Sequence, residues 1–526
     1  MKRIWRTGLA VLIAITVAGL STPAAVAQEP VLRINNTAEP ESLDPGLVTG
    51  VPEHRIISNL FEGLTTTDPK DLSPQPGMAR SWTVSRDGLI YTFNLRDAAW
   101  TDGRKVTAQD FVYAWERVLN PKTGAKYAQQ LYYVKNGQEY NKGQITDFAL
   151  VGVKAVDART LQVTLNCPTA YFLDLTSFYT LYPVPRWAIE AHGNDWIKPG
   201  KIVSNGPFRL TAWVPQRDLV LEKNPAHWDA ATVKLGRVVF IPTDDINTAY
   251  KQFLAGDSDW IPTVPPAQID SARQRPEWYV APYLGTYYFR FNVTRSPFSD
   301  VRVRKALSMA VDREQLTRFV TKAGEIPAST FVPAGMRGYE GVRGLAFDPV
   351  VAKKLLAEAG FPDGKGFPKT ELLYNTNEAH RVITQAVQQM WAQHLGIQVE
   401  LANVEWKVYL ARQSKLDFHV SRAGWIGDYV DPNTFLDMWI TGGGNNQTGW
   451  SNKRYDELIA KAGCGVVDPR ERTRLLTEAE KILVADEVPI MPLYTYVNKG
   501  MLSKKVKGWY PNILDQHPLK YISIEK

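Results

Sequence analysis

The chain has 526 residues, which is long enough for two or three domains with a large buried core. Lysine and arginine number 61 against 54 acidic residues, and without the three basic residues near the N-terminus the net charge is only +4. Because this small charge is spread with mixed signs, it argues against nucleic acid as a partner. Two cysteines are too few for a disulfide-based scaffold.

The N-terminal segment has the layout of a cleavable export signal. Lys2, Arg3 and Arg6 precede an apolar run from Leu9 to Leu20, and Ala25-Val26-Ala27 predicts cleavage after Ala27. The run is shorter than the roughly 20 residues that cross a bilayer, so a retained membrane anchor is the weaker alternative. No cysteine stands at the cleavage site, which excludes a lipid anchor there. We therefore expect an exported, soluble mature chain.

Strand and helix signals alternate along the mature chain, which predicts mixed α/β layers. Residues 89–95 and 161–165 alternate apolar and polar side chains, as half-buried strands do. Asp348-Pro349 begins a predicted helix of about three turns that ends at Gly360. Asp468-Pro469 begins another, which runs to about Val484. Since no Gly/Ser linker or repeat marks a serial boundary, we expect discontinuous domains.

A βαβ unit is predicted between these two helices. Residues 371–374 form a buried strand, residues 378–395 a helix that ends at Gly396, and residues 397–401 an alternating strand.

The motifs of common enzymes and metal sites are missing from the sequence. It contains no Gly-x-Ser-x-Gly, no His-Glu-x-x-His and no Cys-x-x-Cys. Gly442-Gly443-Gly444 is not followed by the lysine and serine of a phosphate-binding loop. We therefore predict no catalytic residue, no metal and no cofactor.

One carboxylate, Asp428, lies among glycines, aromatics and an isoleucine between Arg422 and Leu436. A carboxylate in apolar surroundings is costly unless a cation or hydrogen-bond donors compensate it. The neighbouring Gly424 and Gly427 would let another backbone come close. We predict that Asp428 binds one positive charge of a ligand. A structural ion pair or a turn cap is the alternative.

Several short motifs occur together in one order along the chain. They are Gly-Val-Pro-Glu at 50–53, Asn-Leu-Phe-Glu-Gly-Leu at 59–64, Trp-Thr-Asp-Gly at 100–103, Asp-Phe-Val-Tyr-Ala-Trp at 110–115, Phe-Ser-Asp-Val-Arg-Val-Arg-Lys-Ala-Leu at 298–307, and Arg-Ala-Gly-Trp-Ile-Gly-Asp-Tyr with Asp-Pro-Asn-Thr-Phe-Leu at 422–436. From about residue 31 onward the chain resembles the periplasmic oligopeptide-binding proteins of ABC importers. Each string is weak alone, but the ordered set is specific.

The resemblance implies a two-lobed α/β fold of the class II type with an extra accessory α/β domain. Residues 28–65, 200–284 and 481–526 would form lobe I, residues 66–199 the accessory domain packed on it, and residues 285–480 lobe II. Gly285 and the Asp486 region would be the crossings between lobes. The resemblance also implies a monomer in the periplasm that passes short peptides to an inner-membrane ABC permease complex.

A peptide receptor must hold what all peptides share. We expect Asp428 to bind the ligand's N-terminal ammonium, while the backbone of 424–427 and of 284–286 pairs with an extended ligand. By resemblance, Arg422 and His380 would meet its C-terminal carboxylate. The full predicted site is Asp428, Arg422, Gly424, Trp425, Ile426, Gly427, Tyr283, Gly285, Thr286, Glu53, Asn375, His380 and Tyr496. Alternatively, Glu53 caps a helix beginning near His54, and Arg422 pairs with Asp417.

Four positions depart from the best-known members of the family. Arg290 and Gln130 stand where those proteins can carry a glutamate and a tyrosine, and Pro262-Thr263 replaces a polar-aromatic pair. These departures argue against carrying over a preference for basic side chains. The family's domain assignment puts Cys167 and Cys464 in different lobes, and α-carbons more than about 7 Å apart cannot be bridged. We therefore predict two free thiols.

Two rival functions stay open at this stage. A secreted peptide or glycan hydrolase would use Asp428 and Asp431 as acid and base. A receptor of the same fold could instead take dipeptides, murein peptides or a metal chelate, since the fold alone does not choose the cargo.

Overall fold

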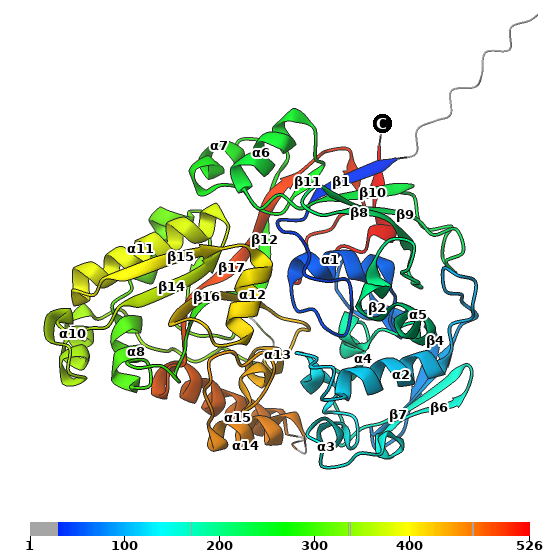
Figure 1. Ribbon diagram of the computed structural model, residues 1–526, viewed down its shortest axis with the longest axis horizontal. Coiled ribbons are helices and arrows are strands. Elements are labelled where there is room, and N and C mark those ends of the chain that lie inside the picture. The colour runs from blue at the N-terminus through cyan, green and yellow to red at the C-terminus, as the bar shows by residue number, and fades with distance from the viewer. Residues whose placement is uncertain are drawn as a thin grey trace, which may run out of the picture.

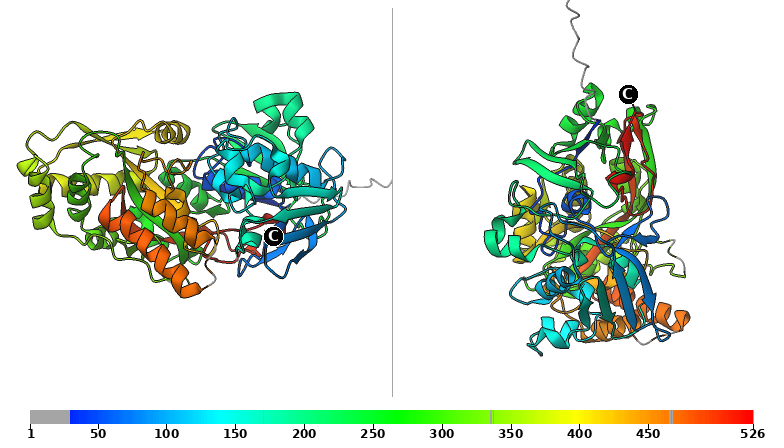
Figure 2. Two further views of the ribbon diagram at one scale, coloured as in Figure 1. Left: turned by 90° about the horizontal axis from the view of Figure 1, so that it is seen from below. Right: turned by 90° about the vertical axis from the view of Figure 1, so that its right-hand side faces the viewer.

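The computed structural model describes residues 30–525 except residues 170, 335, 337, 465 and 467. The predicted export signal, residues 1–27, lies outside the described residues. Helices and strands alternate along the chain, which confirms the predicted mixed α/β class. Figures 1 and 2 show two bodies side by side with long strands running between them. No helix in the described part is long and apolar enough to cross a membrane.

One 11-stranded sheet runs through both bodies. In spatial order its strands are β15 (Val399–Val404), β14 (Thr370–Asn375), β16 (Val420–Ile426), β12 (Trp278–Phe291), β17 (Ile490–Leu502), β11 (Trp260–Ile261), β1 (Val31–Asn35), β10 (Arg237–Ile241), β9 (Asp218–Lys223) and β8 (Phe208–Val214), with β13 (Ile326–Pro327) pairing with β17 off this path. The body that contains β1 is called lobe I below, and the body that contains β16 is called lobe II.

The two central strands connect the lobes. Residues 278–282 of β12 pair with residues 497–501 of β17, whereas residues 286–290 pair with residues 490–495, and the register shifts in between. On the side of the first set of pairs, β17 also pairs with β11. On the side of the second set, β12 also pairs with β16. The chain therefore crosses between lobes at 283–285 and 495–497. Asp486 lies before β17, in a helical turn, so the second crossing falls later than the sequence suggested.

Local sequence signals explain the helices of lobe II. In α10 (Pro349–Glu358) the Asp348 side chain accepts a hydrogen bond from the Val351 N–H at 2.9 Å. The helix α11 (Glu378–Leu395) ends at Gly396, whose φ of 70° suits a residue without a β-carbon. Strands β14 and β15 are parallel and α11 connects them, so the predicted βαβ unit is confirmed. The other lobe II helices are α8 (Val301–Met309), α9 (Arg313–Gln315), α12 (Trp406–Ser414), α13 (Asn433–Leu436), α14 (Lys453–Gly463) and α15 (Pro469–Lys481).

The stretch of residues 66–199, called the accessory segment below, carries a second sheet of four strands. The order of its strands is β4 (Ala79–Val84), β5 (Ile90–Leu95), β7 (Thr160–Thr164) and β6 (Val153–Asp157), and its helices are α2 (Ala108–Leu119), α3 (Gly137–Asn141), α4 (Phe172–Leu175) and α5 (Arg186–His192). Strands β5 and β7 match the two alternating stretches predicted from sequence. A buried ion pair ties this segment to lobe I, because Arg117 on α2 donates to both carboxylate oxygens of Asp44 at 2.9 and 2.6 Å.

Lobe I also contains α1 (Val51–Leu60), α6 (Ile246–Ala255) and α7 (Ile269–Ala272). Short strands complete the described chain: β2 (Thr65–Thr67) with β3 (Pro74–Pro76), and β18 (Val506–Lys507) with β19 (Ser523–Ile524).

The prediction of two free thiols is wrong. Cys167, which follows β7, and Cys464, which follows α14, form a disulfide, with their α-carbons 5.4 Å apart. The two residues do lie in different bodies, but α14 and α15 reach the accessory segment, so the two sulfur atoms meet. Figure 2 shows these helices beside the accessory segment.

Candidate functional site

A cavity of about 400 Å³ lies between the two lobes and is lined by residues of both. This volume is within the range of about 300–1,000 Å³ that is usual for ligand sites. Most of the predicted site residues line it: Asp428, Arg422, Gly424, Trp425, Ile426, Gly427, Tyr283, Asn375, His380 and Tyr496. Gly285, Thr286 and Glu53 do not.

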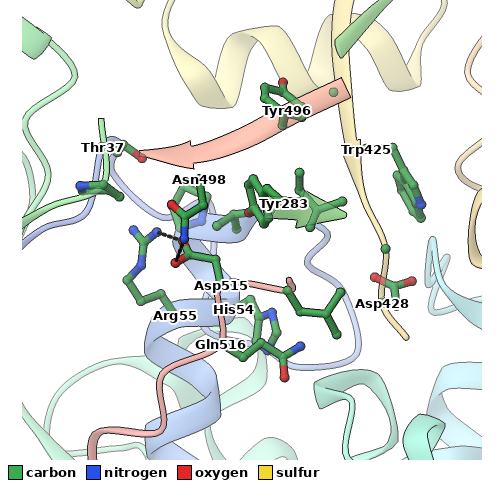
Figure 3. A pocket seen from close by; sticks show the side chains of 18 of the residues that line it. Thr37, His54, Arg55, Tyr283, Trp425, Asp428, Tyr496, Asn498, Asp515 and Gln516 are labelled. Atoms are coloured by element: carbon green, nitrogen blue, oxygen red, sulfur yellow. Dashed lines mark hydrogen bonds and ion pairs between the residues drawn. The ribbon is translucent and has the colours of Figure 1, made fainter. Parts of the chain in front are cut away.

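Asp428 lies at one end of the cavity beside Trp425, on the stretch that follows β16 (Figure 3). Its carboxylate accepts hydrogen bonds from Gln130 Nε2 at 3.0 Å and from the Tyr127 hydroxyl at 3.4 Å. Both donors are neutral, and no cation of the described chain lies within 4.0 Å. Burial, with the carboxylate of Asp437 nearby, raises the pKa of Asp428 well above its ordinary value. Neither an ion pair nor a helix cap occupies this carboxylate, so it is suited to a ligand cation.

The other two acids of this region are already paired within the protein. Arg472 donates to both oxygens of Asp431 at 2.9 and 2.7 Å, and Asp431 does not line the cavity. Asp437 accepts hydrogen bonds from Tyr133 and Asn433, and burial raises its pKa to about 7. An acid and base pair made of Asp428 and Asp431 has no support in this arrangement.

Arg422 gives the cavity an unpaired positive charge. One guanidinium nitrogen donates to Asn375 Oδ1 at 3.0 Å and another to the Tyr496 hydroxyl at 3.5 Å, while Nε is buried without a partner. No carboxylate of the described residues lies within 4.0 Å, and Asp417 pairs with Arg412 instead. His380 is neutral, because burial and the charge of Arg422 lower its pKa well below the usual range. Arg422 is therefore a better partner than His380 for an anionic group of a ligand.

One edge of β16 is open along the cavity. Strand β14 pairs with β16 only at Val420 and Ser421, whereas β12 pairs with the whole length of its other edge. The Gly427 N–H donates to Leu284 O on the β12 side. Because backbone groups alternate between edges in an antiparallel ladder, those of Gly424 and Ile426 face the open edge. That edge can accept an extended ligand as an added strand.

The backbone of 284–286 cannot do the same, which corrects a prediction. Gly285 and Thr286 pair with Ile426 and Trp425 on one side, and Thr286 pairs with Thr495 on the other. The Leu284 N–H donates to Ile513 O and its carbonyl accepts from Gly427, so the protein itself uses the backbone groups of Leu284 and Thr286.

The glycines also serve a different purpose from the one expected. A β-carbon on Gly424 would collide with the Tyr496 hydroxyl, and one on Gly427 would lie 3.0 Å from Leu284. Glycine here makes room for side chains of the chain's own strands rather than for another backbone.

Glu53 lies behind the cavity wall rather than on it. It is fully buried in the first turn of α1, where it accepts hydrogen bonds from the Glu41 N–H at 2.6 Å and from Trp406 Nε1 at 3.3 Å. Trp406 begins α12, so this bond joins lobe I to lobe II. Burial raises the pKa of Glu53 to about 7. The helix begins after Gly50, so the alternative of a Glu53 cap is wrong as well.

Sequence reasoning missed a group of polar residues that line the cavity on the lobe I side, namely Arg55, Asn498, Asp515 and His517. Asp515 accepts hydrogen bonds from Asn498 Nδ2 at 2.6 Å and from His517 at 2.6 Å, and Arg55 lies 3.9 Å from it. These residues line the cavity opposite Asp428 (Figure 3). Arg55 and Asp515 are far apart in the chain, and no local pattern connects them.

Comparison with known proteins identifies the family. Residues 73–447 match the model of the bacterial extracellular solute-binding proteins, family 5. The chain belongs to this family. The oligopeptide-binding protein OppA of Bacillus subtilis is 39% identical over 91% of this chain and 89% of its own length. The family consists of binding proteins, and its members include periplasmic and extracellular ones.

Solved structures of family 5 proteins confirm the predicted two-lobed fold. Haemophilus influenzae OppA in complex with the peptide RPPGFSPFR is 33% identical, covers 95% of this chain and 99% of its own, and has a TM-score of 0.91. The murein tripeptide-binding protein MppA of Escherichia coli, 37% identical, matches over 95% of this chain and 99% of its own with a TM-score of 0.91. The unliganded open form of MppA covers 95% of this chain and 98% of its own, but its TM-score is only 0.61. The lobes of this chain are therefore not arranged as in the open form.

Proposed function

We propose that this protein is a periplasmic receptor that holds short peptides in extended form between its lobes and delivers them to an inner-membrane ABC importer. One observation carries the proposal: Asp428 and Arg422 face the same cavity, and neither charge has an opposite charge of the protein within 4.0 Å. A peptide supplies both missing partners, an ammonium and a carboxylate. We propose that it acts as a monomer without catalysis, with residues 66–199 as an accessory domain and with crossings between the lobes at 283–285 and 495–497.

The spacing of the two charges fits a short guest. Asp428 follows Arg422 by six positions, of which those up to Ile426 are extended strand, so their α-carbons are at most about 20 Å apart. A peptide of two to five residues spans about 7–17 Å. Its backbone would pair with the open edge of β16. Hydrogen bonds of this kind do not depend on the side chains of the peptide. A micromolar affinity needs only about 8 kcal/mol, which one desolvated ion pair and several backbone hydrogen bonds can supply.

The test is mass spectrometry of the ligands that denaturation releases from protein purified after export. We expect peptides of about two to five residues with free amino termini. A guest without an amine, such as a bare metal chelate, would contradict the proposal. Incubation of the protein with free tripeptides should leave them intact, and cleaved products would favour a hydrolase.

A further inference from the structure

The disulfide joins two surfaces that meet beside the cavity. We define the seam as residues 127–133, 167–169 and 171 of the accessory segment together with residues 428–437, 463, 464, 466 and 468–472 of lobe II. Across it, the Tyr171 ring stacks on the Tyr429 ring at 4.7 Å, and Asn433 Nδ2 donates to the Tyr133 hydroxyl at 2.6 Å. The bond from Gln130 to Asp428 also crosses the seam. The cysteine pair therefore lies in the same surface that covers the Asp428 end of the cavity.

The seam lies apart from the strands that connect the lobes. In Figure 1 it is at the lower edge of the molecule, where α14 and α15 face α3, whereas β12 and β17 pass above it. The Arg117–Asp44 ion pair, whose side chains are 17% and 4% exposed, binds the accessory segment to lobe I. Separation of the lobes about residues 283–285 and 495–497 would therefore open the seam.

A disulfide in this place restricts that motion. Disulfide formation requires α-carbons within about 7 Å, and those of Cys167 and Cys464 are 5.4 Å apart. One structure of MppA matches this chain with a TM-score of 0.91 and its unliganded open form with 0.61, so a relative also adopts an arrangement that differs from this one. Any opening of the seam that moves these two α-carbons beyond about 7 Å is incompatible with the bond.

We propose, on the basis of the proposed peptide-binding function, that the Cys167–Cys464 disulfide is a redox-controlled latch. The oxidised protein keeps its lobes closed on the peptide, and the dithiol form opens for loading and release. These are the only two cysteines of the chain, so its redox response is confined to this pair.

The chemistry is thiol–disulfide exchange with a small disulfide such as glutathione disulfide. One cysteine thiolate attacks that disulfide and releases one glutathione thiolate, and the second cysteine thiolate displaces the other glutathione. The net reaction converts two protein thiols and one glutathione disulfide into the protein disulfide and two glutathione thiols. Dithiothreitol reverses it and becomes a cyclic disulfide.

The test measures peptide exchange in the full mature chain. Oxidised protein loaded with trialanine is mixed with an excess of ¹³C-labelled trialanine, and native mass spectrometry follows the replacement with and without dithiothreitol. We expect exchange to be about tenfold faster or more after reduction. The variant carrying both Cys167→Ser and Cys464→Ser should exchange rapidly in both conditions. Equal exchange rates of oxidised and reduced wild type would overturn the latch.

A second measurement does not depend on the ligand. Small-angle X-ray scattering of ligand-free protein should give a larger radius of gyration for the reduced form and for the double serine variant than for the oxidised form. Equal radii, or two titratable thiols in denatured protein that was never reduced, would overturn the latch. If the double serine variant bound no trialanine while the radii differed, the peptide function would fail and the latch would stand.

Discussion

At the scale of single residues, Asp428 accepts hydrogen bonds from the neutral donors Gln130 and Tyr127, so a ligand ammonium can supply the cation that this carboxyl group lacks. Asp428→Asn removes the charge and keeps the size. Because a hydrogen bond to a charged group is worth about 1.5–3 kcal/mol, trialanine should bind more weakly by that amount. N-acetyl-trialanine, which has no ammonium, should bind wild type and variant alike. Isothermal titration calorimetry of the reduced proteins measures both affinities.

A matched control for this change is Asp417→Asn. Asp417 has a side chain that is 57% exposed and pairs with Arg412 outside the cavity, so its loss should leave the affinity for trialanine unchanged. An equal loss of affinity for trialanine and its acetylated form in Asp428→Asn would show that Asp428 acts on the fold rather than on the ammonium.

The sequence predicted Asp428 because its surroundings are local: glycines and aromatics on both sides mark an isolated carboxylate. It could not predict that Gln130 and Tyr127 donate to it, since they come from the accessory segment. The same reason explains why Asp515 was missed. Its partners Arg55 and Asn498 belong to separate elements, and only the assembled cavity brings them together.

At the scale of elements, the contact between β16 and β17 depends on Gly424. The Tyr496 hydroxyl occupies the space of a β-carbon, so Gly424→Ala forces the Tyr496 ring or one of the strands to shift. Overpacking of this kind costs about 1–3 kcal/mol. We expect weaker binding of trialanine, because Tyr496 and the open edge of β16 both border the cavity. Titration calorimetry and chemical denaturation measure the two effects.

Tyr496→Phe provides the rescue for this variant. Without the hydroxyl, the nearest atom to the new β-carbon is Tyr496 Cζ at 3.4 Å, an ordinary contact. The double variant should therefore recover most of the lost affinity. No recovery would mean that Gly424 is needed for its backbone conformation rather than for the approach of Tyr496.

The accessory segment is attached to lobe I through Arg117 on α2. Arg117→Met leaves the buried Asp44 carboxylate without its cation, which typically costs about 3–5 kcal/mol. The free energy of unfolding should fall by this amount in urea denaturation. The control is Arg186→Met, because Arg186 pairs with Glu190 at an exposed site, where ion pairs contribute about 0–1 kcal/mol. Similar losses in both variants would contradict a special role of Arg117.

At the scale of the whole molecule, sequence reasoning succeeded where signals are local and failed where lobes meet. The caps of α10 and the glycine after α11 fixed those helices almost to the residue, because a few neighbours decide a helix end. Cys167 follows β7 of the accessory segment and Cys464 follows α14 of lobe II. The inference that they are too far apart was wrong, because lobes that close on a cavity bring residues 297 positions apart into contact.

Closure should also depend on pH through Glu53. In the closed arrangement burial raises its pKa from 4.5 to about 7, whereas separation of α12 from α1 would expose it and lower its pKa toward the ordinary value. Its favourable contribution to closure is therefore complete below pH 4.5 and is lost as the pH rises through 7. A shift of this size corresponds to about 3 kcal/mol at most. His54 beside it stays neutral in this window, because burial lowers its pKa to about 4.

Glu53→Gln isolates this contribution, since glutamine keeps the oxygen that accepts from Glu41 and Trp406 and carries no charge at any pH. The ratio of the two affinities at each pH does not depend on the titration of Asp428, because both proteins contain this residue. The affinity of the variant for trialanine should exceed that of wild type at pH 8 by up to about 100-fold and equal it at pH 4.5. A ratio of affinities that does not change with pH would mean that Glu53 stays buried when the lobes separate, so that closure takes up no proton there.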